Sequence, residues 1–240
     1  PKAGAIPLFH IGNRIMELLI SLSKAVSAFT EKDKAAFDKW FGKSVVRDPR
    51  GNPLTVYHGT TGNFDSFDKK RLGIGNDEYG IGFYFTDSAE FARYYAKDSG
   101  STLPVYLKIQ KPIIFEKQPR MTFVQATKIA NGLSRPHFNR FLAENYDLEY
   151  QGLQSAKKEY LDNFVGMDVI DAGNNLLQDL YKDEPESWRF PEVFAAATGR
   201  DGIIAKRGQH FFYVVFSPIQ IKSAIGNRGT FKPRTENILE

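Results

Sequence analysis

Apolar side chains recur every three or four residues near the start of the chain, which predicts an amphipathic helix over residues 8–29. The stripe consists of Leu8, Ile11, Ile15, Leu18, Leu19, Leu22, Val26 and Phe29. A second helix is expected from Thr30, whose hydroxyl can cap its first turn, to Phe41, and Gly42 ends it. Residues 1–42 are therefore predicted to be a helical N-terminal extension that packs on the domain or connects it to an upstream one. A membrane-surface or partner helix is the alternative.

Short apolar segments that predict strands follow residue 43. The expected strand segments are 45–57, divided by a turn at 49–51, then 105–115, interrupted by Pro112, and the antiparallel pair 202–205 and 211–216. A short helix is expected at 88–97, capped by Asp87 or Ser88. The glycine-rich residues 61–80 predict a long loop, whose length suggests a function beyond connection.

The spacing returns to a helical period between residues about 120 and 198, with Ala126, Ile129 and Ala130 as one example. This stretch separates two strand-rich parts of the chain, so we interpret it as a helical insertion. The predicted organisation is a 1–42 extension, a 43–232 domain that contains the insertion, and a 233–240 tail. The fold class expected from these elements is α+β.

Composition narrows the class of protein only slightly. The 240 residues are 42% hydrophobic and 14% aromatic, enough for a sizeable core, and the net charge of +4 is too small to indicate nucleic-acid binding by itself. The chain has no cysteine, which excludes disulfides and thiolate chemistry. No apolar run reaches the length of a membrane span, so we expect a soluble protein. The chain begins at Pro1, which suggests a piece of something longer.

The segment Val-Tyr-His-Gly-Thr at residues 56–60 is the first candidate site. It is expected to be a strand that ends in His58, Gly59 and Thr60. A histidine at a strand end is most often structural, but the neighbouring glycine would let a ligand amide approach the backbone. No second histidine or carboxylate follows at metal-ligand spacing, so no metal site is expected here.

A second candidate segment is Gly-Ile-Gly-Phe-Tyr-Phe-Thr-Asp at residues 80–87. It has no strand before it, which argues against a dinucleotide-binding glycine fingerprint of the Rossmann type. Tyr84 and Tyr95 lie on either side of the start of the short helix. Either one alone would be interpreted as a core residue. Two aromatic walls that face each other would also suit a flat cationic ring.

Together, these segments resemble the ADP-ribosyltransferase superfamily, in its diphtheria-toxin and poly(ADP-ribose)-polymerase-like branch with a His-Tyr-Glu triad. The Trp-Phe-Gly at 40–42, the Gly-Asn-Pro-Leu at 51–54 and the closing segment 216–224 are similar to a narrower group, the transferase domains of phage and mobile-element polyvalent proteins. The resemblance covers roughly residues 39–232, less the insertion. It implies a split, mainly antiparallel sheet around an NAD cleft.

The resemblance also implies roles for individual residues. His58 would hydrogen bond the adenosine ribose, Gly59 would hold the nicotinamide amide through its backbone, and Thr60 would support the same ribose. Tyr84 matches the triad tyrosine and Tyr95 the tyrosine that stacks on nicotinamide.

Two further positions follow from the same resemblance. Ala92 stands where poly(ADP-ribose) polymerases have a serine hydroxyl on the amide, so one hydrogen bond to NAD is missing. Residues 68–80 match the loop that covers the adenosine.

The third triad position departs from the family pattern. The strand alignment places Phe212 where the family has glutamate, and phenylalanine cannot accept a hydrogen bond. Gln209 or His210 on the preceding turn could substitute, or Asp77 or Glu78 could reach in from the loop. An acceptor group could instead assist the reaction, as in mono-ADP-ribosyltransferases, or the domain could only bind.

Gln220 is also polar, but it lies beyond Pro218 and eight residues from Phe212. In an extended chain that is more than ~20 Å, so we expect Gln220 to be structural.

The function implied by the resemblance is mono-ADP-ribosyl transfer from NAD⁺ to a macromolecular acceptor with release of nicotinamide. NAD⁺ is the substrate and no metal is expected. The acceptor would be protein, RNA or DNA, a cognate immunity protein is a candidate partner, and the setting is a phage- or toxin-associated effector in the cytoplasm of a bacterial or target cell. An NAD glycohydrolase and a catalytically weak NAD- or ADP-ribose-binding module are the alternatives.

Overall fold

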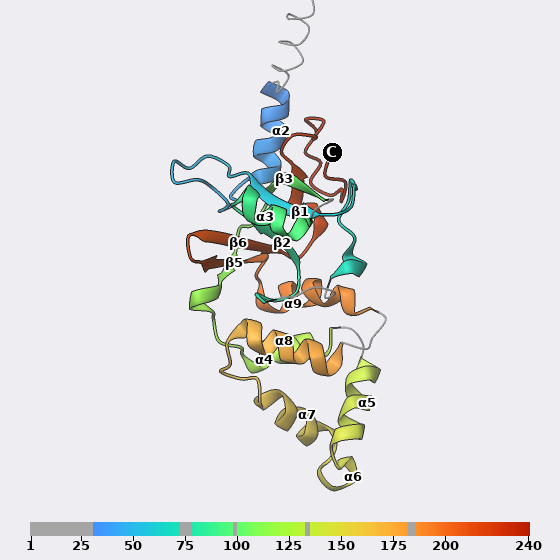
Figure 1. Ribbon diagram of the computed structural model, residues 1–240. Coiled ribbons are helices and arrows are strands. Elements are labelled where there is room, and N and C mark those ends of the chain that lie inside the picture. The colour runs from blue at the N-terminus through green and yellow to red at the C-terminus, as the bar shows by residue number, and fades with distance from the viewer. Residues whose placement is uncertain (1–30, 73–77, 98–99, 133–134, 182–185) are drawn as a thin grey trace, which may run out of the picture.

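The computed structural model describes residues 31–72, 78–97, 100–132, 135–181 and 186–240 (Figure 1). The helix predicted over residues 8–29 and its neighbour's cap at Thr30 lie outside this range. The second predicted helix is confirmed as α2 (Glu31–Phe41), and Gly42 follows it with a φ of +53°. Such a left-handed φ favours glycine at a helix end.

A seven-stranded sheet organises the domain in the order β4-β5-β6-β2-β1-β3-β7. Its strands are β1 (Val56–Thr60), β2 (Phe83–Thr86), β3 (Ser101–Leu107), β4 (Pro112–Ile114), β5 (Gly202–Arg207), β6 (His210–Val215) and β7 (Ile221–Ser223). Neighbouring strands are antiparallel except for β4 and β5, which are parallel. The predicted α+β class with a mainly antiparallel sheet is confirmed.

A set of helices connects β4 to β5 and forms the lower part of the molecule in Figure 1. These helices are α4 (Phe123–Ala130), α5 (Arg135–Asn145), α6 (Leu148–Gln151), α7 (Leu153–Asp162), α8 (Val169–Leu180) and α9 (Phe190–Thr198). They occupy the stretch where the sequence indicates a helical insertion. The remaining helix, α3 (Ala89–Ala96), crosses the sheet beside β1 and β2 (Figure 1).

Because successive side chains of a strand point to opposite faces, the sheet has two buried clusters, one on each face. On β6, Phe212 and Val214 belong to the cluster that the inserted helices cover, whereas Tyr213 and Val215 belong to the other. A third cluster packs α2 against Phe231. The inserted helices therefore share a core with the sheet.

Two predicted strands differ from the structure for local reasons. In residues 45–57 the first half forms only an isolated bridge, because the Asp48 carboxylate accepts from the backbone N–H groups of Arg50 and Asn52 and holds a tight turn. The strand expected over 105–115 is two strands at different places in the sheet. The Asp201 carboxylate accepts from the N–H groups of residues 110 and 111 and turns the chain between them.

The C-terminal residues 233–240, expected as a tail, pack against the domain. Ile238 is buried, and its backbone bonds to Asp65 on one side and Ser223 on the other. The Lys222 ammonium, fully buried on β7, donates to the carbonyls of Thr235 and Asn237 at 3.0 and 2.9 Å. Burial lowers the pKa of Lys222 to about 8.

Candidate functional site

The junction between β1 and β2 is held by a side chain. Tyr57 pairs with Thr86, and one residue further on the His58 ring reaches across, with Nδ1 2.8 Å from the Tyr84 carbonyl oxygen. A carbonyl only accepts, so Nδ1 carries the proton in this bond. Burial lowers the pKa of His58, which favours the neutral imidazole and leaves Nε2 with an acceptor lone pair.

The His58 ring lies among aromatic side chains. Its centroid is 5.0 Å from that of Phe67, 5.5 Å from Phe85 and 6.4 Å from Phe64. Phe67 and Phe85 belong to the cluster opposite the inserted helices, whereas Tyr84 packs against the other cluster. The hydrogen bond thus joins His58 to the backbone of Tyr84, and the two side chains belong to different faces of the sheet.

Gly59 is required by the packing of α3. A Cβ atom at this position would clash with the carbonyl oxygen of Ala92 and would lie 2.9 Å from the backbone nitrogen of Ala96. Ala92 is itself buried against this contact. The sequence predicts that the missing side chain of Gly59 leaves space for a ligand amide. In the direction of the missing Cβ, the backbone of α3 fills that space.

Thr60 and Tyr84 fix turns through their hydroxyl groups. The Thr60 Oγ1 accepts from the Gly62 N–H at 3.0 Å, which closes the turn after β1. The Tyr84 hydroxyl donates to the Gly80 carbonyl at 2.6 Å and accepts from the Tyr79 N–H at 3.1 Å. Gly80 has a φ of +100°, so this phenol holds the glycine turn that precedes β2.

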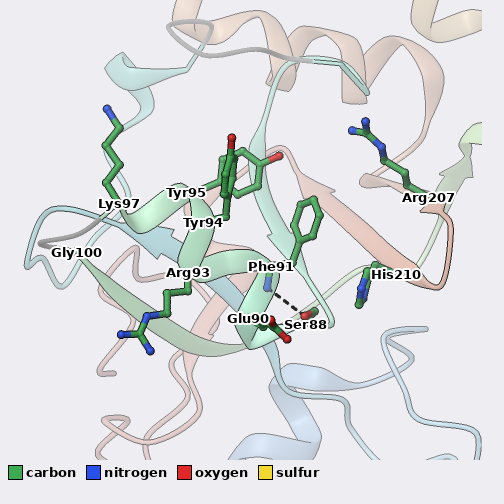
Figure 2. Close-up of a pocket in the computed structure, with 10 residues that line it drawn as sticks. All are labelled: Ser88, Glu90, Phe91, Arg93, Tyr94, Tyr95, Lys97, Gly100, Arg207 and His210. Carbon is green, nitrogen blue, oxygen red and sulfur yellow. Dashed lines mark hydrogen bonds between the residues drawn. The ribbon is translucent and has the colours of Figure 1, made fainter.

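A pocket of about 1280 Å³ lies between α3 and the β5–β6 hairpin (Figure 2). Its lining residues are Ser88, Glu90, Phe91, Arg93, Tyr94, Tyr95, Lys97, Gly100, Arg207 and His210. In Figure 2, Phe91 lies between the two tyrosines and His210. Tyr94 is 80% exposed and Tyr95 55%, so both rings are accessible to a ligand.

Of the predicted site residues, Tyr95 lines this pocket, and so does His210, one of the two turn residues offered as a substitute for the glutamate. Phe212 is a core residue: it is 5% exposed, and its ring lies 5.1 Å from that of Phe91 and 5.5 Å from that of Tyr79. Gln209 is exposed in the hairpin turn, after Gly208 with its φ of +63°. The structure therefore brings neither Phe212 nor Gln209 to the pocket surface, whereas His210, the other predicted polar substitute, lines the pocket.

The two acidic loop residues expected to compensate for Phe212 do not supply a free carboxylate in the described structure. Asp77 lies outside the described residues. Glu78 forms an ion pair with Arg207, with 3.3 Å between Oε2 and the nearest guanidinium nitrogen. Gln220 accepts from the backbone N–H groups of Phe216 and Ser217 and donates to two carbonyls, which is the structural role expected for it.

One residue that the sequence does not single out for a site contacts the pocket lining from behind. Asp87, at the end of β2, lies with Oδ1 3.4 Å from the Nδ1 of His210. The contact depends on the pairing of β2 with β6, in which Thr86 lies opposite Phe212. The sequence indicates Asp87 only as a helix cap, a role that Ser88 performs by accepting from the Phe91 N–H. No local signal in the sequence indicates the contact.

Charges around the pocket balance. The lining contains the cations Arg93, Lys97 and Arg207. Three carboxylates offset them, those of Glu90 in the lining, Glu78 beside Arg207 and Asp87 beside His210. The pocket is therefore polar without a strong field of one sign.

Two absences apply to the described part of the chain alone. Within it, no cluster of three or more His, Asp or Glu side chains could hold a metal ion. None of its helices is both long enough and apolar enough to cross a bilayer.

The α+β fold with its mainly antiparallel seven-stranded sheet is consistent with an ADP-ribosyltransferase-like domain, and a comparison with protein families identifies that class. The family described as ADP-ribosyltransferase in polyvalent proteins matches residues 48–231, more than half of the chain. The chain belongs to this family. No curated protein and no solved structure matches it.

Proposed function

We propose that this domain transfers a single ADP-ribosyl unit from NAD⁺ to a macromolecular acceptor and releases nicotinamide. The family is one of ADP-ribosyltransferases, which use NAD⁺ as substrate. The observation that carries the proposal is the pocket beside α3, where Tyr95, at the position of the nicotinamide-stacking tyrosine, is exposed to a ligand.

The dimensions and chemistry of the pocket support this substrate. Its volume of about 1280 Å³ exceeds the ~300–1,000 Å³ typical of small-ligand sites, so it has room for a dinucleotide. Nicotinamide in NAD⁺ is a flat cationic ring, which an aromatic face attracts by stacking and by cation–π interaction. His58 does not line this pocket, but at the neighbouring β1–β2 junction its neutral ring offers Nε2 as an acceptor, the group that would take the ribose hydroxyl in this proposal.

Two observations support a single transfer, with protein as the acceptor. By the resemblance, Phe212 stands at the position of the glutamate that supports chain elongation in polymerases, so repeated transfer is disfavoured. The balanced charge around the pocket offers no preference for a polyanion, which supports a protein acceptor over a nucleic acid. The relation to polyvalent proteins supports a setting in phage or mobile elements, where the domain would act as a cytoplasmic effector and meet a cognate immunity protein.

The replacement of the glutamate also favours a second candidate function. Without an acidic group at Phe212, the domain would cleave NAD⁺ with water as an NAD glycohydrolase, or bind NAD⁺ or ADP-ribose without turnover. Such a domain would still bind through Tyr95 and His58, so binding alone does not distinguish it from a transferase.

The experiment is to incubate the protein with NAD⁺ labelled in the adenylate part, with and without fractionated lysate, and to measure free nicotinamide and label on protein, RNA and DNA. Transfer predicts nicotinamide release that depends on lysate, with label on protein. Release without lysate would indicate hydrolysis, and saturable binding without release would indicate a binding module.

The matched variants are Tyr95→Ala and Tyr150→Ala. Tyr150 is 91% exposed on α6, in the helical insertion. We expect Tyr95→Ala to weaken NAD⁺ binding at least about tenfold, the order of one lost stacking contact, and Tyr150→Ala to leave it unchanged. Equal binding by both variants, or no binding by the wild type, would refute the proposed site.

A further inference from the structure

His210 and Asp87 form a polar pair at the surface of the pocket. His210 Nδ1 lies 3.4 Å from Asp87 Oδ1, and the His210 side chain is 45% exposed while that of Asp87 is 22% exposed. In Figure 2, Phe91 separates His210 from the two tyrosines. A carboxylate behind an accessible imidazole is the arrangement in which histidine takes a proton and the carboxylate stabilises the resulting cation.

The strand geometry relates this pair to the missing glutamate. Residues 210 and 212 are two apart on β6, so they face the same side of the sheet, about 7 Å apart along the strand. Phe212 faces the core below Phe91, and the His210 ring lies 5.7 Å from the ring of the same phenylalanine. On this face of β6 the polar residue His210 is therefore at the pocket surface, one strand repeat from the buried Phe212.

We propose that His210, oriented by Asp87, is the general base that takes the proton of the attacking acceptor. The proposal rests on the transfer of ADP-ribose described above. The bond between the nicotinamide nitrogen and the ribose C1 breaks, and its electron pair leaves with nicotinamide. The acceptor oxygen forms a bond to C1, its proton moves to His210 Nε2, and the Asp87 carboxylate stabilises the imidazolium until the proton passes to water.

The polar groups around His210 fit this role less well. Glu78 is paired with Arg207, and Gln209 is exposed in the turn outside the lining. Glu90 lines the pocket but is exposed in the first turn of α3, and no hydrogen bond or ion pair among the described residues orients its carboxylate as Asp87 orients His210. The groups that face His210 are Asp87, Ser88, Glu90 and Phe91 on one side and Arg207 across the hairpin.

The test compares His210→Gln, which keeps a polar side chain but cannot take a proton at neutral pH, with His137→Gln. His137 lies on α5 of the insertion and provides the same substitution at a distance from the pocket. We expect His210→Gln to lower kcat for nicotinamide release at least about 100-fold, with the Kd for NAD⁺ changed less than about twofold. Asp87→Asn should lower kcat by a smaller factor, again without loss of binding. His137→Gln should equal the wild type.

A rescue experiment separates a catalytic role from a structural one. Free imidazole added to His210→Ala should restore release in proportion to its concentration, and it should leave release by the wild type and by His137→Gln unchanged. Circular dichroism and melting temperature establish that each variant is folded.

Each outcome has a distinct meaning. An active wild type with an equally active His210→Gln refutes the general base and leaves the transfer proposal standing. A loss confined to NAD⁺ affinity, or a loss in Glu90→Gln instead, assigns the role elsewhere and also refutes it. If the wild type binds NAD⁺ but releases no nicotinamide with any lysate fraction, the transfer proposal fails and the general base fails with it.

Discussion

The α3 backbone lies so close to the sheet that it restricts which residue type can stand at some positions. Gly59 is the clearest case. Nothing larger than hydrogen fits between Gly59 and the Ala92 carbonyl. The sequence predicts a glycine with a function at this place, because a glycine after a strand-end histidine admits a ligand. The structure gives the same glycine a packing requirement, which depends on a helix about thirty residues later in the chain.

Gly59→Ala should lower the free energy of unfolding by about 1–3 kcal/mol, because α3 must move away from β1 to admit the methyl group. Denaturant unfolding followed by circular dichroism measures the change. Gly62→Ala is the matched control, since the nearest atom its Cβ would meet is in the Phe64 ring at 3.7 Å, and it should change stability by less than about 0.5 kcal/mol. Equal stability of the two variants would contradict the packing requirement.

Phe212→Glu should lower the free energy of unfolding by more than about 3 kcal/mol, because it buries an unpaired carboxylate between Tyr79 and Phe91. Phe212→Leu should cost less than about 1.5 kcal/mol, because it keeps an apolar side chain there. The same unfolding assay applies, together with nicotinamide release. A folded Phe212→Glu with raised turnover would show that position 212 belongs to the active site and not to the core.

At the scale of elements, the sequence predicts the helices, because caps and the spacing of apolar residues are local signals. The helix expected at 88–97 is α3, because Ser88 caps its first turn, and the helical period of residues 120–198 corresponds to α4 through α9. Long-range pairing decides the rest. Asp87 meets His210 through the register of β2 on β6, and the buried Lys222 finds its carbonyl partners in residues 233–240. No periodicity within a strand encodes either contact.

Lys222 links β7 to the C-terminal segment and should make stability depend on pH. Its folded-state pKa of about 8 lies below the ordinary value of 10.5, so between these values the unfolded chain binds more protons and stability rises with pH. The free energy of unfolding should rise by roughly 2 kcal/mol from about pH 8 to about pH 10.

Urea unfolding at several pH values, with Lys222→Met beside the wild type, measures this effect. The rise should be lost in Lys222→Met and kept in Lys158→Met, whose side chain is 70% exposed on α7. A rise of the same size in Lys222→Met would assign it to other groups.

At the scale of the whole molecule, the inserted helices are part of the core. The buried cluster that includes Ile129, Val169 and Phe190 continues into Ile203 and Val214 of the sheet. Figure 1 shows the helices extending from one side of the sheet, which gives them the look of an appended unit. The shared cluster shows instead that the sheet lacks a complete core without them.

Replacing residues 120–198 by a short glycine-serine linker should therefore leave a chain without cooperative tertiary structure. The expected signs are binding of a hydrophobic dye, far-UV circular dichroism that keeps its strand signal, and loss of the near-UV spectrum. Tyr150→Ser, a change at an exposed site within the same segment, should keep the wild-type spectra. A deletion protein that unfolds cooperatively would show that the sheet has a sufficient core of its own.

The parallel pair β4 and β5 has a consequence for the order of folding. Pro112 pairs with Gly202, 90 residues later, and closing a flexible loop of that length costs about 4 kcal/mol of chain entropy. Helices within the loop form in microseconds, and their collapse shortens the distance that the two strands must close. The edge of the sheet is thus expected to assemble after the inserted helices, so the rate of refolding would be set by this late closure and not by the hairpin of β5 and β6.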